Sequence, residues 1–178
     1  MKTKTPNHAI LRLLYASVCL ALCMVLPFLT GQIPQIGSML SPMHIPVFLA
    51  GFLCGPWWAL VVGVMAPLLR HLWLGMPPLL TAVAMSFELA TYGAVSGLLY
   101  AKLPRRNGSI YAALLSAMVL GRVVWGAVML VISGLTESVF TWAAFLAGAF
   151  TNAVPGIIVH ILLIPVLVMA LCRAKVIE

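Results

Sequence analysis

The sequence predicts an all-α integral membrane protein with six transmembrane helices, a short second helix, and both termini in the cytoplasm. Of the 178 residues, 63% are hydrophobic and only 7% are charged, and the mean hydropathy is +1.15. Soluble domains typically carry about 25% charged residues. The basic residues gather at the ends of apolar runs, which is typical of cytoplasmic loops. The length suits a single domain, residues 1–178.

The first two spans differ in length. The first follows the basic N-terminus and ends at a loop rich in Gly, Pro and Gln, residues 30–41. The second has about 13 residues, which is short for a hydrocarbon core of about 30 Å. Gly55 and Pro56 end it, and Trp57 and Trp58 open the third span, where tryptophan suits the membrane interface.

Turn residues and charge delimit the other spans. The stretch 75–78, Gly-Met-Pro-Pro, separates the third span from the fourth, and a basic stretch separates the fourth from the fifth. The sixth contains Pro155 and Pro165, which predict a kink or an unwound start. The predicted spans are residues 9–29, 42–54, 57–74, 79–101, 109–133 and 141–172.

The basic clusters set the expected direction of threading. The connections expected outside, residues 30–41, 75–78 and 134–140, contain no Lys or Arg. If the short second segment did not cross, the first and middle clusters would fall on opposite sides, so we count it as a span. The cytoplasmic clusters are then Lys2, Lys4 and Arg12; Lys102, Arg105 and Arg106; and Arg173 and Lys175.

Several function classes are not supported. The net charge of +7 comes mostly from these clusters, and no basic stripe with interleaved aromatics indicates nucleic acid. Cys19 and Cys23 are four residues apart, but no His or Cys motif accompanies them, so we expect packing cysteines and no metal or cofactor. The first apolar run lacks an A-x-A-like site, so we expect no cleavable signal peptide.

Enzyme motifs are absent as well. The chain has no phosphate-binding G-x-x-x-x-G-K-[ST] loop, no H-E-x-x-H and no G-x-S-x-G. Ser116 and His160 could form a serine–histidine pair of the rhomboid type, but neither lies in a supporting motif. His160 is expected deeper toward the inside, as a packing or capping residue. We therefore expect no enzyme activity.

Three polar residues are expected at one depth of the membrane. At about 1.5 Å per helical residue, Glu88, Arg122 and Asn152 lie near the midplane on three different helices. Charge inside a bilayer is costly and usually marks a functional pocket or path. The functional interpretation is a polar pocket that opens outward. The alternative is a buried Glu88–Arg122 ion pair that fixes helix register.

Further candidates for substrate binding are expected above this layer or beside it. Arg70, His71 and His44 are expected toward the outside, although Arg70 could instead extend to lipid headgroups. Gln35, in the first outer loop, could cover a ligand or be solvated. Trp125 follows Arg122 on the same predicted helix.

Small residues mark one face of the first span. Ser17 and Ala21 are four residues apart, as are Cys19 and Cys23. This spacing allows close approach of another helix. It is compatible with docking of a partner protein and with internal packing.

Three features carry a resemblance to a known family: the stretch SPMHIPVFLAGFLCGPWWALVVGVMAPLL (residues 41–69), the stretch FELATYGAVSGLLY (residues 87–100) and the Ser17/Ala21 spacing. With them, nearly the whole chain resembles the substrate-binding S components of energy-coupling factor (ECF) vitamin transporters. It implies that Ser17 and Ala21 dock a membrane-embedded T subunit coupled to two ATPases. The usual pair in the family is two alanines, so this match is partial.

The resemblance also implies a mechanism and a class of substrate. The pocket would be formed by the outer halves of helices four to six, which is where Glu88, Arg122 and Asn152 are expected. The protein would capture a vitamin outside and topple to present it inside the cell, in the plasma membrane of a prokaryote.

The charge of the expected pocket suggests the ligand. Two arginines against one glutamate favour an anionic or zwitterionic ligand; pantothenate is the best expectation, and pyridine or pyrimidine vitamins remain open. The alternative function is a non-transporting scaffold resembling the rod-shape protein MreD, which would need no charged cluster at the midplane.

Overall fold

The structure is a computed structural model in which every regular element of the described residues is a helix. It describes residues 8–30, 33, 37, 39–104, 106–136, 141–148, 153–174 and 176–177. Of the candidate residues, Asn152 and Gln35 lie outside these ranges. The elements are α1 (His8–Val25), η1 (Leu26–Thr30), α3 (His44–Cys54), α4 (Pro56–Leu74), α5 (Leu79–Lys102), α6 (Asn107–Leu135), α7 (Trp142–Leu146) and α8 (Val154–Arg173).

Among the described residues, five helical segments are long and apolar enough to cross a membrane. They are His8–Leu29, Pro56–Leu74, Leu79–Lys102, Asn107–Leu135 and Val154–Arg173. α3 is apolar but has only 11 residues, so it extends roughly 17 Å at 1.5 Å per residue. Eight of its residues are buried, so α3 is an internal helix surrounded by the others. The chain is therefore a multi-pass membrane protein.

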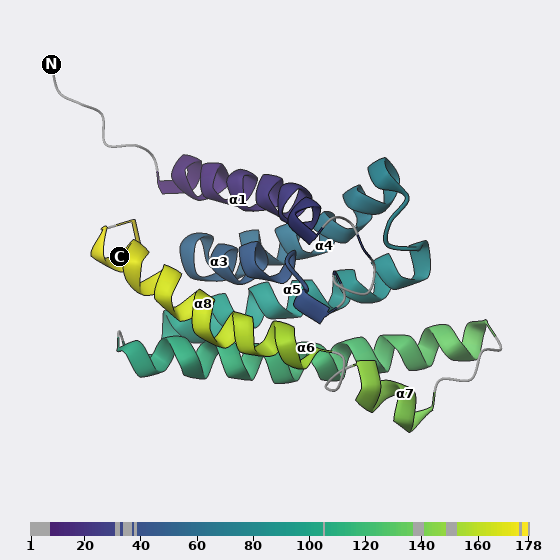
Figure 1. Cartoon of the computed structure of the whole chain (residues 1–178). Helices are drawn as coiled ribbons and strands as arrows, with labels where there is room; N and C mark the ends of the chain where they lie inside the picture. Colours follow the sequence, from purple (N-terminus) through teal and green to yellow (C-terminus); the bar gives the residue numbers. More distant parts are fainter. Residues whose placement is uncertain are drawn as a thin grey trace, which may run out of the picture.

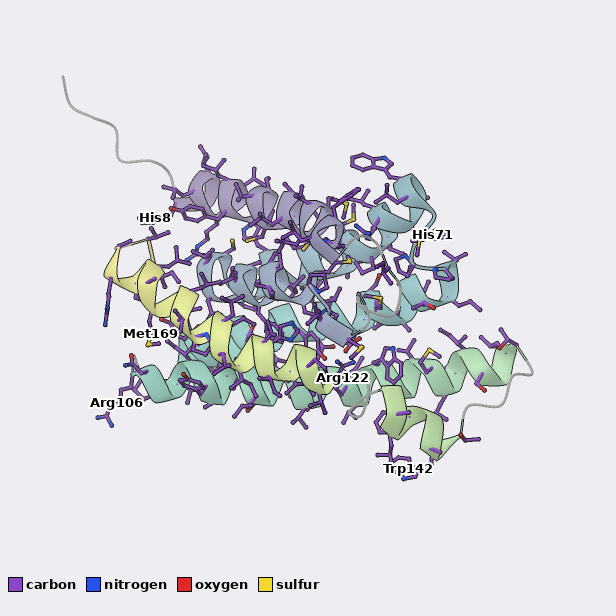
Figure 2. All side chains as sticks on the ribbon, in the orientation of Figure 1. His8, His71, Arg106, Arg122, Trp142 and Met169 are labelled. Atoms are coloured by element: carbon purple, nitrogen blue, oxygen red, sulfur yellow. The ribbon has the colours of Figure 1, made fainter. Side chains whose placement is uncertain are left out.

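The long helices pack side by side in one bundle (Figure 1). The start of α1, the connection from α5 to α6 and the end of α8 lie at the same end of this bundle. Figure 2 labels His8 and Arg106 at that end and His71 toward the opposite end. The bundle thus brings together the three chain segments that carry the basic clusters.

The last predicted span is divided in the structure. Residues 141–172 were expected as one long helix with a kink or an unwound start, whereas α7 and α8 are separate elements. Pro155 lies in the first turn of α8. Because a backbone N–H has no intrahelical partner there, proline begins this helix at little cost, and Pro165 alone lies inside it.

Glycines allow the helices around α5 to approach closely. A Cβ atom at Gly63 of α4 would lie 2.5 Å from the backbone of Leu89, and one at Gly93 of α5 would lie 2.7 Å from the carbonyl oxygen of Ala59. These distances leave no room for a side chain. Without an aqueous driving force between transmembrane helices, such close backbone packing is a main source of their association. α4 and α5 therefore form a rigid pair.

The connection between α4 and α5 is shaped by a glycine cap. Gly75 has φ +67°, a conformation that glycine adopts without the strain of a Cβ atom, and its N–H donates to the carbonyl of His71 at 2.8 Å. The ring nitrogen Nδ1 of His71 also contacts the carbonyl oxygen of Pro77 at 2.8 Å. These contacts position the short loop that leads into α5.

We predict that Gly63→Ala lowers the melting temperature of the detergent-purified protein, because the added methyl group must push α5 away from α4. Overpacking of this kind costs about 1–3 kcal/mol. Gly134→Ala is the matched control, since a Cβ atom there meets open space near the end of α6. The close-packing account is wrong if both variants melt at the native temperature.

Candidate functional site

A cavity of about 410 Å³ lies among η1, the segment before α3, the α4–α5 loop and the middle of α5 and α6. Most of its lining is apolar, with prolines, methionines and a tryptophan. A few polar side chains break this surface, as is usual for sites that bind small molecules. The polar lining residues are Ser41, His44, Arg70, Thr81, Glu88 and Arg122.

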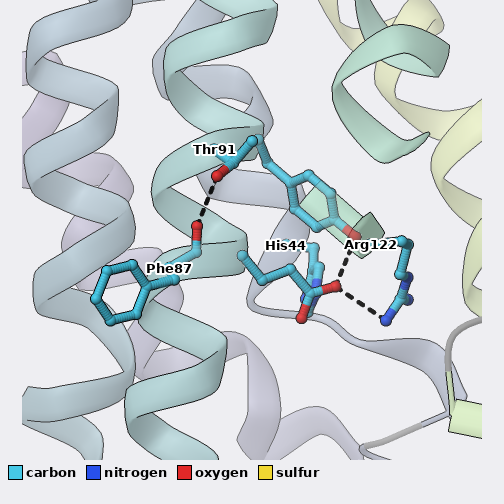
Figure 3. A network of polar contacts seen from close by, with 6 residues as sticks. His44, Phe87, Thr91 and Arg122 are labelled. Carbon is cyan, nitrogen blue, oxygen red and sulfur yellow. Dashed lines mark hydrogen bonds and ion pairs between the residues drawn. The ribbon is translucent and has the colours of Figure 1, made fainter. Parts of the chain in front are cut away.

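A buried ion pair forms the floor of the cavity. Nη1 of Arg122 lies 2.9 Å from Oε1 of Glu88, which is only 2% exposed (Figure 3). The hydroxyl of Tyr92 donates to the same oxygen at 2.6 Å, and Nε2 of His44 lies 3.8 Å from it. A carboxylate in such surroundings requires compensation by opposite charge and hydrogen bonds. α6 supplies the opposite charge and α5 the hydrogen bond, while His44 of α3 packs beside them.

The helices position these groups through local sequence. Glu88 and Tyr92 are four residues apart on α5, so their side chains lie on one face. Gly121 of α6 packs against the Tyr92 ring, where a Cβ atom would collide with the aromatic carbons. This glycine lets α6 come close enough for the neighbouring Arg122 to reach Glu88.

Aromatic rings pack behind the ion pair. His44 stacks on His160 of α8 with ring centroids 5.7 Å apart, and Phe48 stacks on Tyr92 at 4.8 Å. Within the described residues, both ring nitrogens of His44 and Nε2 of His160 are buried without a hydrogen-bond partner. His160 was expected only to pack or cap; it packs directly on a residue of the cavity wall.

The second arginine of the cavity has different surroundings. Arg70 is 5% exposed, and its Nη1 donates to the backbone carbonyl of Met24 at 3.2 Å. Its guanidinium carbon lies 5.6 Å from the centre of the Phe28 ring, which is a cation–π arrangement. Arg70 thus points into the protein and not toward lipid headgroups.

Trp125 lines the cavity one helical turn beyond Arg122. Its ring stacks on Phe145 of α7 at 6.2 Å, and Phe145 in turn stacks on Trp142 at 5.2 Å. α7 therefore packs aromatic rings behind Trp125, and Figure 2 shows this short helix beside the part of α6 that lies beyond Arg122.

The structure brings together five of the predicted substrate-binding residues. Glu88, Arg122, Arg70, His44 and Trp125 all line the cavity. His71 does not line it but holds the α4–α5 loop that does. Asn152 and Gln35 lie outside the described residues.

Sequence reasoning missed Tyr92. The search for intramembrane charge passed over this neutral residue, although its spacing from Glu88 on one helix face was a usable signal.

The predicted docking pair lies on the outer face of α1. Ser17 and Ala21 are exposed, whereas Cys19 and Cys23 on the other face are buried against the bundle. The Cys23 thiol reaches the carbonyl of Met43 at 3.5 Å. The cysteine pair therefore packs internally, and the Ser17/Ala21 pair is open to another molecule.

No group of three or more metal-ligating side chains occurs among the described residues. The cavity can therefore recognise a ligand through charge, hydrogen bonds and apolar contact. Its polar groups are buried inside the bundle and do not face lipid. This arrangement suits a protein that captures a solute in a cavity.

Comparison with known proteins supports this view. The model of the ECF transporter substrate-specific component matches residues 11–168. Searches of curated proteins and of solved structures gave no match. Members of this family are substrate-binding membrane subunits, not enzymes, and they associate with the T and ATPase components of an ECF module. Since the match covers nearly the whole chain, the protein belongs to the family of substrate-specific components of ECF transporters.

Proposed function

We propose that the protein captures a small water-soluble vitamin or vitamin precursor from outside the cell, with pantothenate as the best candidate. It then topples in the plasma membrane of a prokaryote to deliver the ligand inside, energised by two partner ATPases through a T subunit. The observation that carries this proposal is the buried Glu88–Arg122 pair in the wall of a mostly apolar cavity.

The charge of the cavity supports an anionic or zwitterionic ligand. Arg70 and Arg122 face it together with one glutamate, Glu88, so these three groups carry a net positive charge. Pantothenate has one carboxylate, two hydroxyls and an amide, which suit such a mixture of cation, acceptor and apolar surface. A scaffold of the MreD type would have no use for a polar cavity at this depth, and the family match argues against it.

We propose six crossings with both termini in the cytoplasm, counting α3 as the short second crossing. The described members of the basic clusters, Arg12, Lys102, Arg106 and Arg173, belong to the helix ends at one end of the bundle, where α1 starts, α5 ends, α6 starts and α8 ends. Since Lys and Arg favour the cytoplasmic side, the cavity and the α4–α5 loop would face outward. A ligand would then enter from outside.

We propose that the exposed face of α1 docks the T subunit. Ser17 and Ala21 present small side chains there, and Ser17 satisfies its own hydroxyl by donating to the carbonyl of Leu13 at 2.9 Å. A partner helix can therefore approach closely without burying an unpaired polar group.

A first prediction separates a ligand contact from a purely structural ion pair. The single variant Glu88→Gln leaves Arg122 buried without its carboxylate, which costs about 3–5 kcal/mol. The double variant Glu88→Gln/Arg122→Gln removes both charges and should melt close to the native temperature. We expect its affinity for pantothenate, measured by calorimetry, to fall at least about 10-fold, since charged hydrogen bonds are worth about 1.5–3 kcal/mol.

The double variant also provides the contradicting outcome. If it binds pantothenate with native affinity, the pair only fixes helix register and the ligand contacts other groups.

A second prediction concerns topology. In a cysteine-free background, Asn107→Cys should resist a membrane-impermeant maleimide added to intact cells and react after the cells are opened. Leu74→Cys, at the other end of the bundle, is the control and should react in intact cells. External labelling at position 107 would reverse the proposed orientation.

A third prediction concerns the coupling surface. Ser17→Leu and Ala21→Leu should retain ligand affinity but lose ATP-dependent uptake at least about 10-fold in membranes that contain the T subunit and ATPases, because the bulky side chains hold the partner helix away. Ala112→Leu, at an exposed position of α6, is the matched control and should transport normally.

Two results would count against this docking surface. Joint loss of binding and uptake would show that this face packs internally. Full uptake by both variants would show that coupling occurs elsewhere.

A further inference from the structure

Arg70 is a buried cation whose contacts among the described residues carry no negative charge. Its guanidinium has five N–H donors, and within the described part of the chain it meets the Met24 carbonyl and the Phe28 ring. Both are weak partners for the full positive charge of a residue that is only 5% exposed. A buried charge normally has an opposite charge beside it.

The other charges of the cavity are already matched. Glu88 is the single acidic residue among those that the structure describes, and it pairs with Arg122 at 2.9 Å. Tyr92 and His44 approach the same carboxylate oxygen, Oε1. The positive charge of the site therefore resides at Arg70, which lines the same cavity from near the end of α4.

Extension to lipid headgroups does not account for this placement. A snorkelling arginine ends with its guanidinium at the surface, whereas Arg70 is held inward by the carbonyl of Met24 and the ring of Phe28. These two contacts orient the guanidinium without neutralising it, so it is held in place for an anion that arrives from the cavity.

We propose that Arg70 is the anion-binding group of the site and that it receives a single carboxylate of the ligand. The opposite end of the ligand would donate hydrogen bonds to Oε2 of Glu88. This oxygen is proposed because the described partners of Glu88 approach its other oxygen, Oε1. The ligand class is then a small monoanion with a carboxylate at one end and hydroxyl or amide donors at the other. This inference rests on the proposed function.

The charge balance makes the site selective. A carboxylate at Arg70 brings the net charge of the described cavity groups to zero. A neutral analogue leaves the buried guanidinium without an anion and should bind more weakly, because leaving a charged group unpaired costs more than losing a neutral hydrogen bond. A ligand with a net positive charge would add a second unmatched cation.

The test uses pantothenate and pantothenol, which differ only in a carboxylate against a primary alcohol. Calorimetry on the purified native protein should show pantothenate bound about 10- to 100-fold more tightly. Arg70→Gln should abolish this preference by weakening pantothenate to the level of pantothenol, while pantothenol binding stays unchanged and shows that the cavity is folded. Arg70→Lys should keep part of the preference.

Arg173→Gln is the matched control, since it removes an exposed arginine at the other end of the bundle and should keep the full preference. If the Arg70→Gln variant retains the native preference for pantothenate, the proposal is wrong, and Arg70 is a structural or lipid-binding group. Equal binding of both compounds by the native protein would also overturn it.

The failure of the proposed function would look different. A native protein that binds neither compound and releases no small molecule on denaturation would refute substrate capture itself. Mass spectrometry could identify another released ligand. If that ligand has a single acid group and the Arg70→Gln variant no longer binds it, the result supports Arg70 as the anion-binding group. If the released ligand has no acid group, Arg70 is not an anion-binding group, but the proposed function of substrate capture is supported.

Discussion

The buried pair of Glu88 and Arg122 is the interaction on which the site depends. A carboxylate so completely buried is stabilised by the guanidinium that α6 delivers at 2.9 Å and by the hydrogen bond from Tyr92 of α5, while His44 of α3 lies beside it at 3.8 Å. Gly121 allows the approach of α6 by accepting the Tyr92 ring against its backbone. The ion pair therefore constrains helix positions and gives the cavity a polar floor at the same time.

Much of this arrangement could be predicted from sequence because intramembrane charge is rare and costly. The spans assigned from the sequence put Glu88 and Arg122 at one depth on different helices, and in the structure these two residues are in contact. Four of the long helices, α1, α4, α5 and α6, agree with the predicted spans within a few residues, since composition limits them sharply at basic stretches and turn residues, whereas the predicted span 141–172 is divided into α7 and α8. Six crossings and the direction of insertion remain proposals drawn from charge.

The remaining features depend on tertiary packing that local sequence does not encode. Whether Arg70 reaches outward to headgroups or inward to a cavity is decided by the Met24 carbonyl and the Phe28 ring, which belong to a distant segment. Pro155 could kink one long helix or begin a new one, and in the structure it lies in the first turn of α8. His160 packs behind the cavity wall only because α8 lies against α3, where it stacks on His44.

The central claim is that a ligand binds between the Glu88–Arg122 pair and Arg70. An experimental structure of the protein purified in the presence of pantothenate tests it most directly. We expect ligand density inside this cavity, with the carboxylate within hydrogen-bond distance of the Arg70 guanidinium and a hydroxyl or amide donor near Glu88. Density elsewhere, or a cavity that holds only water at saturating pantothenate, would contradict it.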